Sequence, residues 1–185
     1  MTDAEADLFR RLAPECGGRI ETIGNGVDTT QYSPSRDHAN PFVAGTRPIV
    51  FTGAMDYWPN VDGVRWFVEA VWPRVRDAFA AAHFMIVGMR PTAAVKALAS
   101  PSVTVTGTVP DVRPYLQHAD VVVAPLRVAR GVQNKILEAM AMGKPVVATN
   151  ACGAGIDGVF HQLLDDAGGP LNHLAGGDLV DHARW

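Results

Sequence analysis

Three basic residues gather around one predicted helix start: Arg127, Arg130 and Lys135. The helix is expected to begin near Gly131. A helix N-terminus offers unpaired N–H groups and the positive end of a dipole, which together favour an anion. The chemistry that this arrangement suits is the binding of a diphosphate. Spacing alone leaves an ordinary solvated basic face open as the alternative.

A carboxylate follows on the same predicted helix. Glu138 stands four residues after Asn134 and three after Lys135, so the three side chains can share one helix face. A carboxylate in that place could accept hydrogen bonds from both hydroxyls of a ribose. The same spacing also fits a surface ion pair between Lys135 and Glu138, and that alternative stays open.

The elements that must position these residues alternate between short apolar runs and helical patterns. Runs that are apolar at consecutive positions predict strands covered on both faces. The predicted strands are 49–52, 84–87, 103–106, 121–124 and 145–148. The predicted helices are 2–12, 61–75, 92–99, 111–118 and 132–142.

The second of these helices carries an internal proline. Its valines recur at steps of three and four, which is typical of one buried helix face. They are Val61, Val64, Val68, Val71 and Val75. Pro73 has no N–H and crowds the preceding turn, so we expect a kink or a break near Trp72.

This alternation predicts an α/β fold, a Rossmann-like parallel sheet with helices on both faces. Ligands of such open sheets bind at the carboxyl ends of the strands. Gly53, Gly88 and Gly107 each come directly after a predicted strand. Glycine lets a backbone approach a ligand closely, although a tight turn without a ligand explains any one of them alone.

Length and composition fit one soluble globular domain. The chain has 185 residues, of which 48% are hydrophobic and 19% charged, and its formal net charge is −3. That charge gives no support to nucleic-acid binding. No apolar run approaches the roughly 20 residues of a membrane span, and the N-terminus carries no secretory signal. We therefore expect a cytoplasmic protein.

The cysteines and histidines indicate neither a disulfide framework nor a metal site. Cys16 and Cys152 stand far apart, and the six histidines show no metal-ligand spacing. Gly153 to Gly158 matches the dinucleotide motif G-x-G-x-x-G literally, with Asp178 as its acidic residue. Gly168-Gly169-Pro170 interrupts the helix that this motif requires, so we interpret the segment as a glycine-rich loop.

The run from Ile23 to Asp157 resembles the C-terminal domain of GT-B-fold glycosyltransferases of the GT4 type (group 1). It is most similar to the sugar transferases associated with exopolysaccharide and PEP-CTERM/exosortase loci. The resemblance rests on the order and spacing of short pieces. They are Asn25 to Asp28, Phe51 to Asp62, Ile86 to Gly88, Val105 to Val112, Ala119 to Pro125 and Leu137 to Thr149.

The resemblance implies a retaining, metal-independent hexosyltransferase that needs no cofactor and takes a UDP- or GDP-linked sugar as donor. Glu138 corresponds to the second glutamate of the family's E-x7-E motif and would hold the donor ribose. The backbone of residues 107–109 would meet the nucleobase, and Gly53 with residues 131–135 would face the diphosphate. The expected donor-binding residues are Gly53, Gly107, Thr108, Val109, Arg127, Arg130, Gly131, Gln133, Asn134, Lys135 and Glu138.

Two departures from the family pattern matter. Arg130 stands where the first glutamate of E-x7-E is expected, so no catalytic residue is assigned. The loop from Asp56 to Asp62 also lacks the Arg and Lys pair that many relatives direct at the phosphates. We expect Arg127, Arg130 and Lys135 to supply that charge instead.

The resemblance also divides the chain. Residues 1–47 are expected to be the end of an N-terminal domain and an interdomain linker, 48–159 the nucleotide-sugar-binding domain, and 160–185 an atypical, truncated tail. A glycan or lipid-linked acceptor would bind an N-terminal domain missing here, and the full-length enzyme could associate peripherally with a membrane. This fragment alone should bind a sugar nucleotide without transferring the sugar. A non-catalytic nucleotide-binding remnant and a GT-B-fold sugar-nucleotide epimerase are the alternatives.

Overall fold

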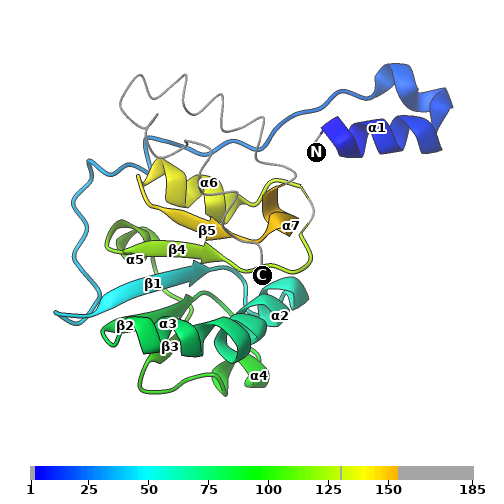
Figure 1. Cartoon of the computed structure of the whole chain (residues 1–185). Helices are drawn as coiled ribbons and strands as arrows, with labels where there is room; N and C mark the ends of the chain where they lie inside the picture. Colours follow the sequence, from blue (N-terminus) through cyan, green and yellow to red (C-terminus); the bar gives the residue numbers. More distant parts are fainter. Residues whose placement is uncertain (1–2, 130, 154–185) are drawn as a thin grey trace.

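The computed structural model describes residues 3–129 and 131–153, and a five-stranded parallel sheet organises this part of the chain (Figure 1). The strands run in the order β3-β2-β1-β4-β5. They are β1 (Arg47–Thr52), β2 (Ala82–Val87), β3 (Val103–Gly107), β4 (Val121–Ala124) and β5 (Val146–Ala148). The sheet with its flanking helices confirms the predicted Rossmann-like α/β fold.

Helices precede and connect the strands. They are α1 (Asp3–Leu12), the 3-10 helix η1 (Pro14–Arg19), α2 (Trp58–Trp66), the π-helical η2 (Phe67–Val71), α3 (Trp72–Ala78), α4 (Ala93–Lys96), α5 (Arg113–Gln117), α6 (Asn134–Ala141) and α7 (Asn150–Gly153). In Figure 1, α1 stands apart from the sheet. None of the helices described is long and apolar enough to span a membrane.

Two helices begin later than the sequence predicts. Helix α6 begins at Asn134, because Gly131 has a φ of +63° and Gln133 is extended. Helix α5 begins at Arg113, whose backbone N–H donates a 2.9 Å hydrogen bond to the Asp111 carboxylate. Asp111 therefore satisfies a free N–H at the helix start, as its type predicts, from a position outside the helix.

The valine-patterned helix breaks at the predicted place. The N–H of Trp72 donates to the carbonyl of Phe67, five residues back, which closes a π turn. Pro73 follows at once and has no N–H to donate, and its ring would clash with the carbonyl four residues before it. The wider turn of η2 accommodates the proline and separates α2 from α3.

The core lies on both faces of the sheet because side chains alternate along each strand. On one face Phe51, Phe84 and Ile86 pack with Phe67 of η2 and Trp72 of α3. On the other face the intervening strand residues pack against α5 and the C-terminal half of α6. Burial on both faces explains why the strands are apolar at consecutive positions.

Two glycines bring the loops after β1 and β2 into direct contact. A Cβ on Gly88 would lie 1.7 Å from the carbonyl oxygen of Gly53. The backbone N–H of Gly53 also donates a 3.0 Å hydrogen bond to the carbonyl of Val87. No other residue type fits at Gly88, so this contact fixes the carboxyl ends of β1 and its neighbour β2 relative to each other.

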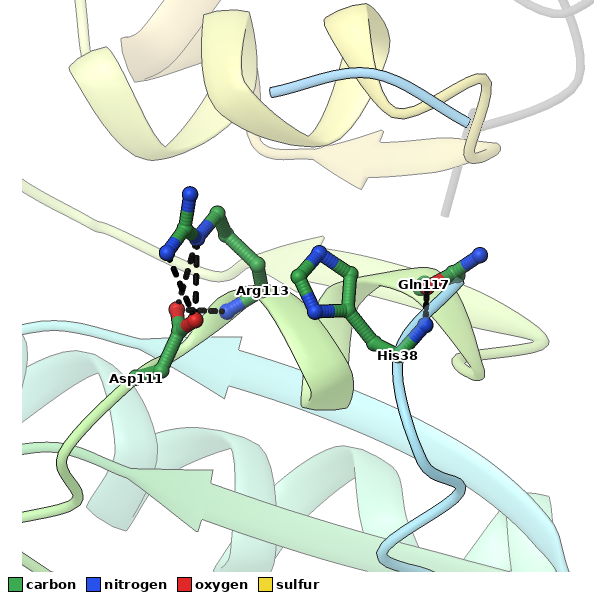
Figure 2. A network of polar contacts seen from close by, with 4 residues as sticks. All are labelled: His38, Asp111, Arg113 and Gln117. Carbon is green, nitrogen blue, oxygen red and sulfur yellow. Dashed lines mark hydrogen bonds and ion pairs between the residues drawn. The ribbon is translucent and has the colours of Figure 1, made fainter. Parts of the chain in front are cut away.

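Part of the segment before β1 is attached to α5, as Figure 2 shows. The backbone N–H of His38 donates to Gln117 Oε1 at 3.0 Å, and Gln117 Nε2 donates to the carbonyl of Arg36 at 2.5 Å. Beside this contact, Asp111 and Arg113 form an ion pair with each other. The segment that the sequence predicts as a linker is therefore hydrogen-bonded to the sheet domain.

Candidate functional site

A cavity of about 510 Å³ opens at the carboxyl ends of β1 and β2, beside the N-terminus of α6. Strand β1 pairs with β2 on one side and β4 on the other, and α6 follows β4. The cavity therefore lies where the order of connections reverses, the usual ligand position in open α/β sheets. The predicted site residues that line it are Gly53, Thr108, Val109, Gln133, Asn134, Lys135 and Glu138.

Lys135 extends from the first turn of α6 toward the end of β1. Its Nζ donates a 2.7 Å hydrogen bond to Asn60 Oδ1 and lies 4.1 Å from the centroid of the Phe51 ring. A cation over an aromatic face is attracted by the ring electrons. A Cβ at Gly53 would lie 3.2 Å from the same ammonium, so glycine there leaves it room.

Burial lowers the pKa of Lys135 to about 8. The cause is desolvation, which disfavours the charged ammonium. Nearby Cys152 and Glu138 act in the opposite direction and raise this pKa. The lysine therefore titrates close to the physiological range, and an anion bound beside it would favour its charged form.

Asn60 holds the Lys135 ammonium from the start of α2. This residue is only 6% exposed, and its Nδ2 donates a 2.9 Å hydrogen bond to the carbonyl of Ala54. Pro59 beside it is one of the first residues of α2, where proline costs no hydrogen bond. The amide is thus fixed on one side by the loop after β1 and turned toward Lys135 on the other.

Glu138 lies one turn after Lys135 on α6 and also lines the cavity. Burial raises its pKa, while the Tyr32 hydroxyl and the charge of Lys135 lower it. The ion pairs formed by the described residues do not include Lys135 with Glu138. The carboxylate is therefore available to a ligand, apart from its interaction with Tyr32.

The predicted linker contributes to the cavity wall. Asn25 Nδ2 donates to Asn134 Oδ1 at 2.9 Å and to the carbonyl of Val132 at 3.3 Å, across the turn that leads into α6. Tyr32 reaches Glu138 from the same segment. Asn25 and Tyr32 both line the cavity. The segment before β1 therefore helps to shape the site.

Some lining residues are not predicted from the sequence. Thr52, the last residue of β1, is only 4% exposed, and its hydroxyl has no hydrogen-bond partner among the described residues. The lining residues outside the predicted set are Asn25, Tyr32, Thr52, Ala54, Tyr57, Asn60, Val87, Gly88, Met89, Val112 and Val132. Several of them flank Gly53 and Gly88, so the glycines at the strand ends are the sequence signal that points to them.

Other predicted residues lie away from the cavity. Arg127 pairs with Asp62, with 2.8 Å between its Nε and the carboxylate, and does not line the cavity. Gly107 ends β3 and Gly131 precedes α6 without lining it. Arg130, the glycine-rich segment after Gly153, Asp178 and the tail 160–185 lie outside the described residues. Of the three predicted cations, the structure brings Lys135 to the cavity.

The arrangement suits a ligand with both phosphates and hydroxyls. One wall offers the Lys135 ammonium and the N-terminus of α6, which favour negative charge. The Glu138 carboxylate, one turn further along α6, can accept hydrogen bonds from hydroxyl groups. Among residues 3–129 and 131–153, no group of three or more histidine, cysteine, aspartate or glutamate side chains could hold a metal ion.

Sequence and structure comparisons show which known proteins the chain is similar to. The family model described as "Glycosyl transferases group 1" matches residues 46–167. A comparison with curated proteins found no match. Among solved structures, WaaG, a glycosyltransferase involved in lipopolysaccharide biosynthesis, is 18% identical with a TM-score of 0.67, over 90% of this chain and 46% of WaaG.

Two further solved structures are similar. HepE of Anabaena in complex with UDP and glucose is 17% identical, with a TM-score of 0.60 over 90% of this chain and 52% of HepE. A glycosyltransferase from Rickettsia africae ESF-5 is 20% identical, with a TM-score of 0.59 over 72% of this chain and 39% of that protein. The chain thus spans about half the length of these proteins or less. At these identities the likeness is one of fold.

Proposed function

The chain belongs to the group 1 glycosyl transferases, and we propose that residues 48–159 form a donor-binding domain for a nucleotide-diphosphate sugar. The observation that carries this proposal is the cavity at the carboxyl ends of β1 and β2, with Lys135 and Glu138 one turn apart in its wall. HepE was solved with UDP and glucose, which makes UDP-linked sugars the first candidates.

The proposed roles follow from chemistry. The diphosphate would lie against Lys135, Gly53 and the N-terminus of α6, the donor ribose against Glu138, and the base near Thr108 and Val109. When the sugar–phosphate bond breaks, negative charge grows on the departing nucleotide diphosphate. A preorganised ammonium and helix N-terminus stabilise such charge without a metal.

The transfer reaction itself requires more than this domain. We propose that residues 1–47 are the end of an acceptor-binding domain and its linker, and that a glycan or lipid-linked acceptor binds that other half. The chain alone then binds donor but does not transfer sugar. A retaining mechanism and a place among the exopolysaccharide and PEP-CTERM-associated enzymes are part of this proposal.

Calorimetric titration of the full chain with UDP, GDP and ADP, and with their sugar conjugates, tests donor binding. We expect one nucleotide class to bind, and Lys135→Ala to weaken it about tenfold or more, because hydrogen bonds to charged groups are worth about 1.5–3 kcal/mol. Lys96→Ala, an exposed lysine on α4, is the matched control and should bind as wild type does.

The same titration separates the competing functions. If no nucleotide binds, the chain is a remnant without donor binding and the proposal is wrong. If a UDP-sugar binds and is converted to its epimer, the epimerase alternative replaces transfer. Unchanged binding by Lys135→Ala would remove Lys135 from the phosphate site.

A further inference from the structure

The cation in the cavity is held by an amide and not by a carboxylate. Arg47, Arg90, Arg113 and Arg127 are each paired with an aspartate. Lys135 makes no ion pair within the described part of the chain, and its hydrogen-bond acceptor is Asn60 Oδ1. An amide oxygen orients an ammonium without neutralising it, so the positive charge remains available to an anion.

The amide has a fixed orientation. Asn60 is buried, and its Nδ2 is engaged by the Ala54 carbonyl at 2.9 Å, which leaves Oδ1 for Lys135. Lys135 follows Asn60 by 75 residues, on the helix after β4. Asn60 therefore holds a cation from α6 against the loop that follows β1.

The space around this pair is kept free by Gly53. A Cβ there would lie 2.8 Å from Asn60 Nδ2 and 3.2 Å from Lys135 Nζ. Next to Gly53, Thr52 lines the cavity with a buried hydroxyl that has no partner among the described residues. An uncompensated ammonium and an unused hydroxyl in one wall indicate an anionic ligand at this point.

We propose that Asn60 is a positioning residue that holds the Lys135 ammonium, without neutralising it, at the carboxyl end of β1 for the diphosphate of the donor. This inference rests on the proposed function. Asn60 then affects binding of the diphosphate through Lys135 and makes no contact with the base or ribose.

Two substitutions separate the charge from the shape of this residue. Asn60→Asp keeps the size but places a carboxylate against the ammonium, so the cation is neutralised and phosphate is repelled. Asn60→Ala removes the hydrogen bond from Lys135 Nζ and leaves the ammonium without that acceptor. The side chain in Asn60→Asp is close to asparagine in size but cannot donate to the Ala54 carbonyl. Circular dichroism and thermal unfolding of each variant therefore establish that it is folded before its binding is compared.

The experiment measures binding of the tightest nucleoside diphosphate, of its free nucleoside and of inorganic pyrophosphate to the full chain. We expect Asn60→Asp to weaken binding of the diphosphate and of pyrophosphate about tenfold or more. Binding of the nucleoside should weaken less than about twofold. Lys135→Met should do the same. In the Lys135→Met background, Asn60→Ala should cause no further loss, because residues acting through one another are not additive.

Different results overturn different claims. If the wild-type chain binds none of the diphosphates, the proposed function fails and this inference fails with it. If Lys135→Met loses binding while folded Asn60→Asp keeps it, donor binding stands and the role of Asn60 is refuted. Additive losses in the double variant, or equal losses for diphosphate and nucleoside, would likewise show that Asn60 does not act through Lys135.

Discussion

Gly88 shows how a single missing side chain sets the position of the site. A Cβ would lie 1.7 Å from a backbone oxygen, and neither strand end can move without disturbing the central sheet. We predict that Gly88→Ala lowers the free energy of unfolding by at least about 2 kcal/mol, within the usual cost of overpacking or above it. Urea denaturation measures this.

The control for Gly88 is Gly17, where an added Cβ would meet nothing within 4 Å. Gly17→Ala should change the free energy of unfolding by no more than about 0.5 kcal/mol, as surface substitutions usually do. Equal effects of the two substitutions would mean that the loops after β1 and β2 are not locked together.

The lowered pKa of Lys135 predicts opposite effects of rising pH on stability and on diphosphate binding. Its folded pKa of about 8 is below its ordinary value of 10.5, so between these the unfolded chain binds more protons and stability rises with pH. Diphosphate binding should instead weaken above pH 8, because the ammonium that binds it is lost. Lys135→Met should remove both trends, measured by urea unfolding and by calorimetry from pH 7 to 10.

Persistence of either trend in Lys135→Met would assign that trend to other titrating groups and not to the lysine. The control therefore decides whether the buried ammonium is responsible.

The sequence predicts Lys135 and Glu138 because their spacing on one helix is a local property. It does not reveal that Arg127 is paired with Asp62, since 65 residues separate them. Asn60 is missed for the same reason, as its role depends on a lysine 75 residues away. Residues that meet only through the tertiary fold leave no periodic signal.

At the scale of elements, the strands and the break before Pro73 follow from local patterns, and both were predictable. The start of α6 was not, because the positive φ of Gly131 and the extended Gln133 delay the helix to Asn134. Asn25 contacts this turn from a segment 107 residues earlier that the sequence marks only as a linker. Local pattern thus predicts which elements form, and less well where a functional helix begins.

The attachment of residues 36–38 to α5 predicts a difference in the rate of proteolysis. Gln117 accepts a hydrogen bond from the His38 N–H (Figure 2) and donates one to the Arg36 carbonyl. It therefore holds the peptide bond after Arg36 against the helix. Gln117→Ala should speed tryptic cleavage after Arg36 several-fold, while the melting temperature changes little. Mass spectrometry of a limited digest measures the rate.

Arg113→Gln is the matched control on the same helix. Arg113 pairs with Asp111 and makes none of the hydrogen bonds to residues 36–38 that hold the linker. The Arg113→Gln substitution should therefore leave the rate of cleavage after Arg36 unchanged. If Gln117→Ala also leaves this rate unchanged, the contact of His118 Nε2 with the His38 carbonyl at 2.6 Å is enough to hold the segment.

At the scale of the whole molecule, the segment before β1 and the ends of the central strands share one cavity. Asn25 and Tyr32 line it together with residues from the ends of β1 and β2 and from α6. A nucleotide that fills the cavity should therefore slow hydrogen exchange in residues 25–32 as well as in 52–60, 87–89 and 132–138. Exchange in α1 and β5, whose residues do not line the cavity, should stay unchanged. Protection confined to 52–60, 87–89 and 132–138 would show that the ligand binds without residues 25–32, and that the position of this segment and ligand binding are independent.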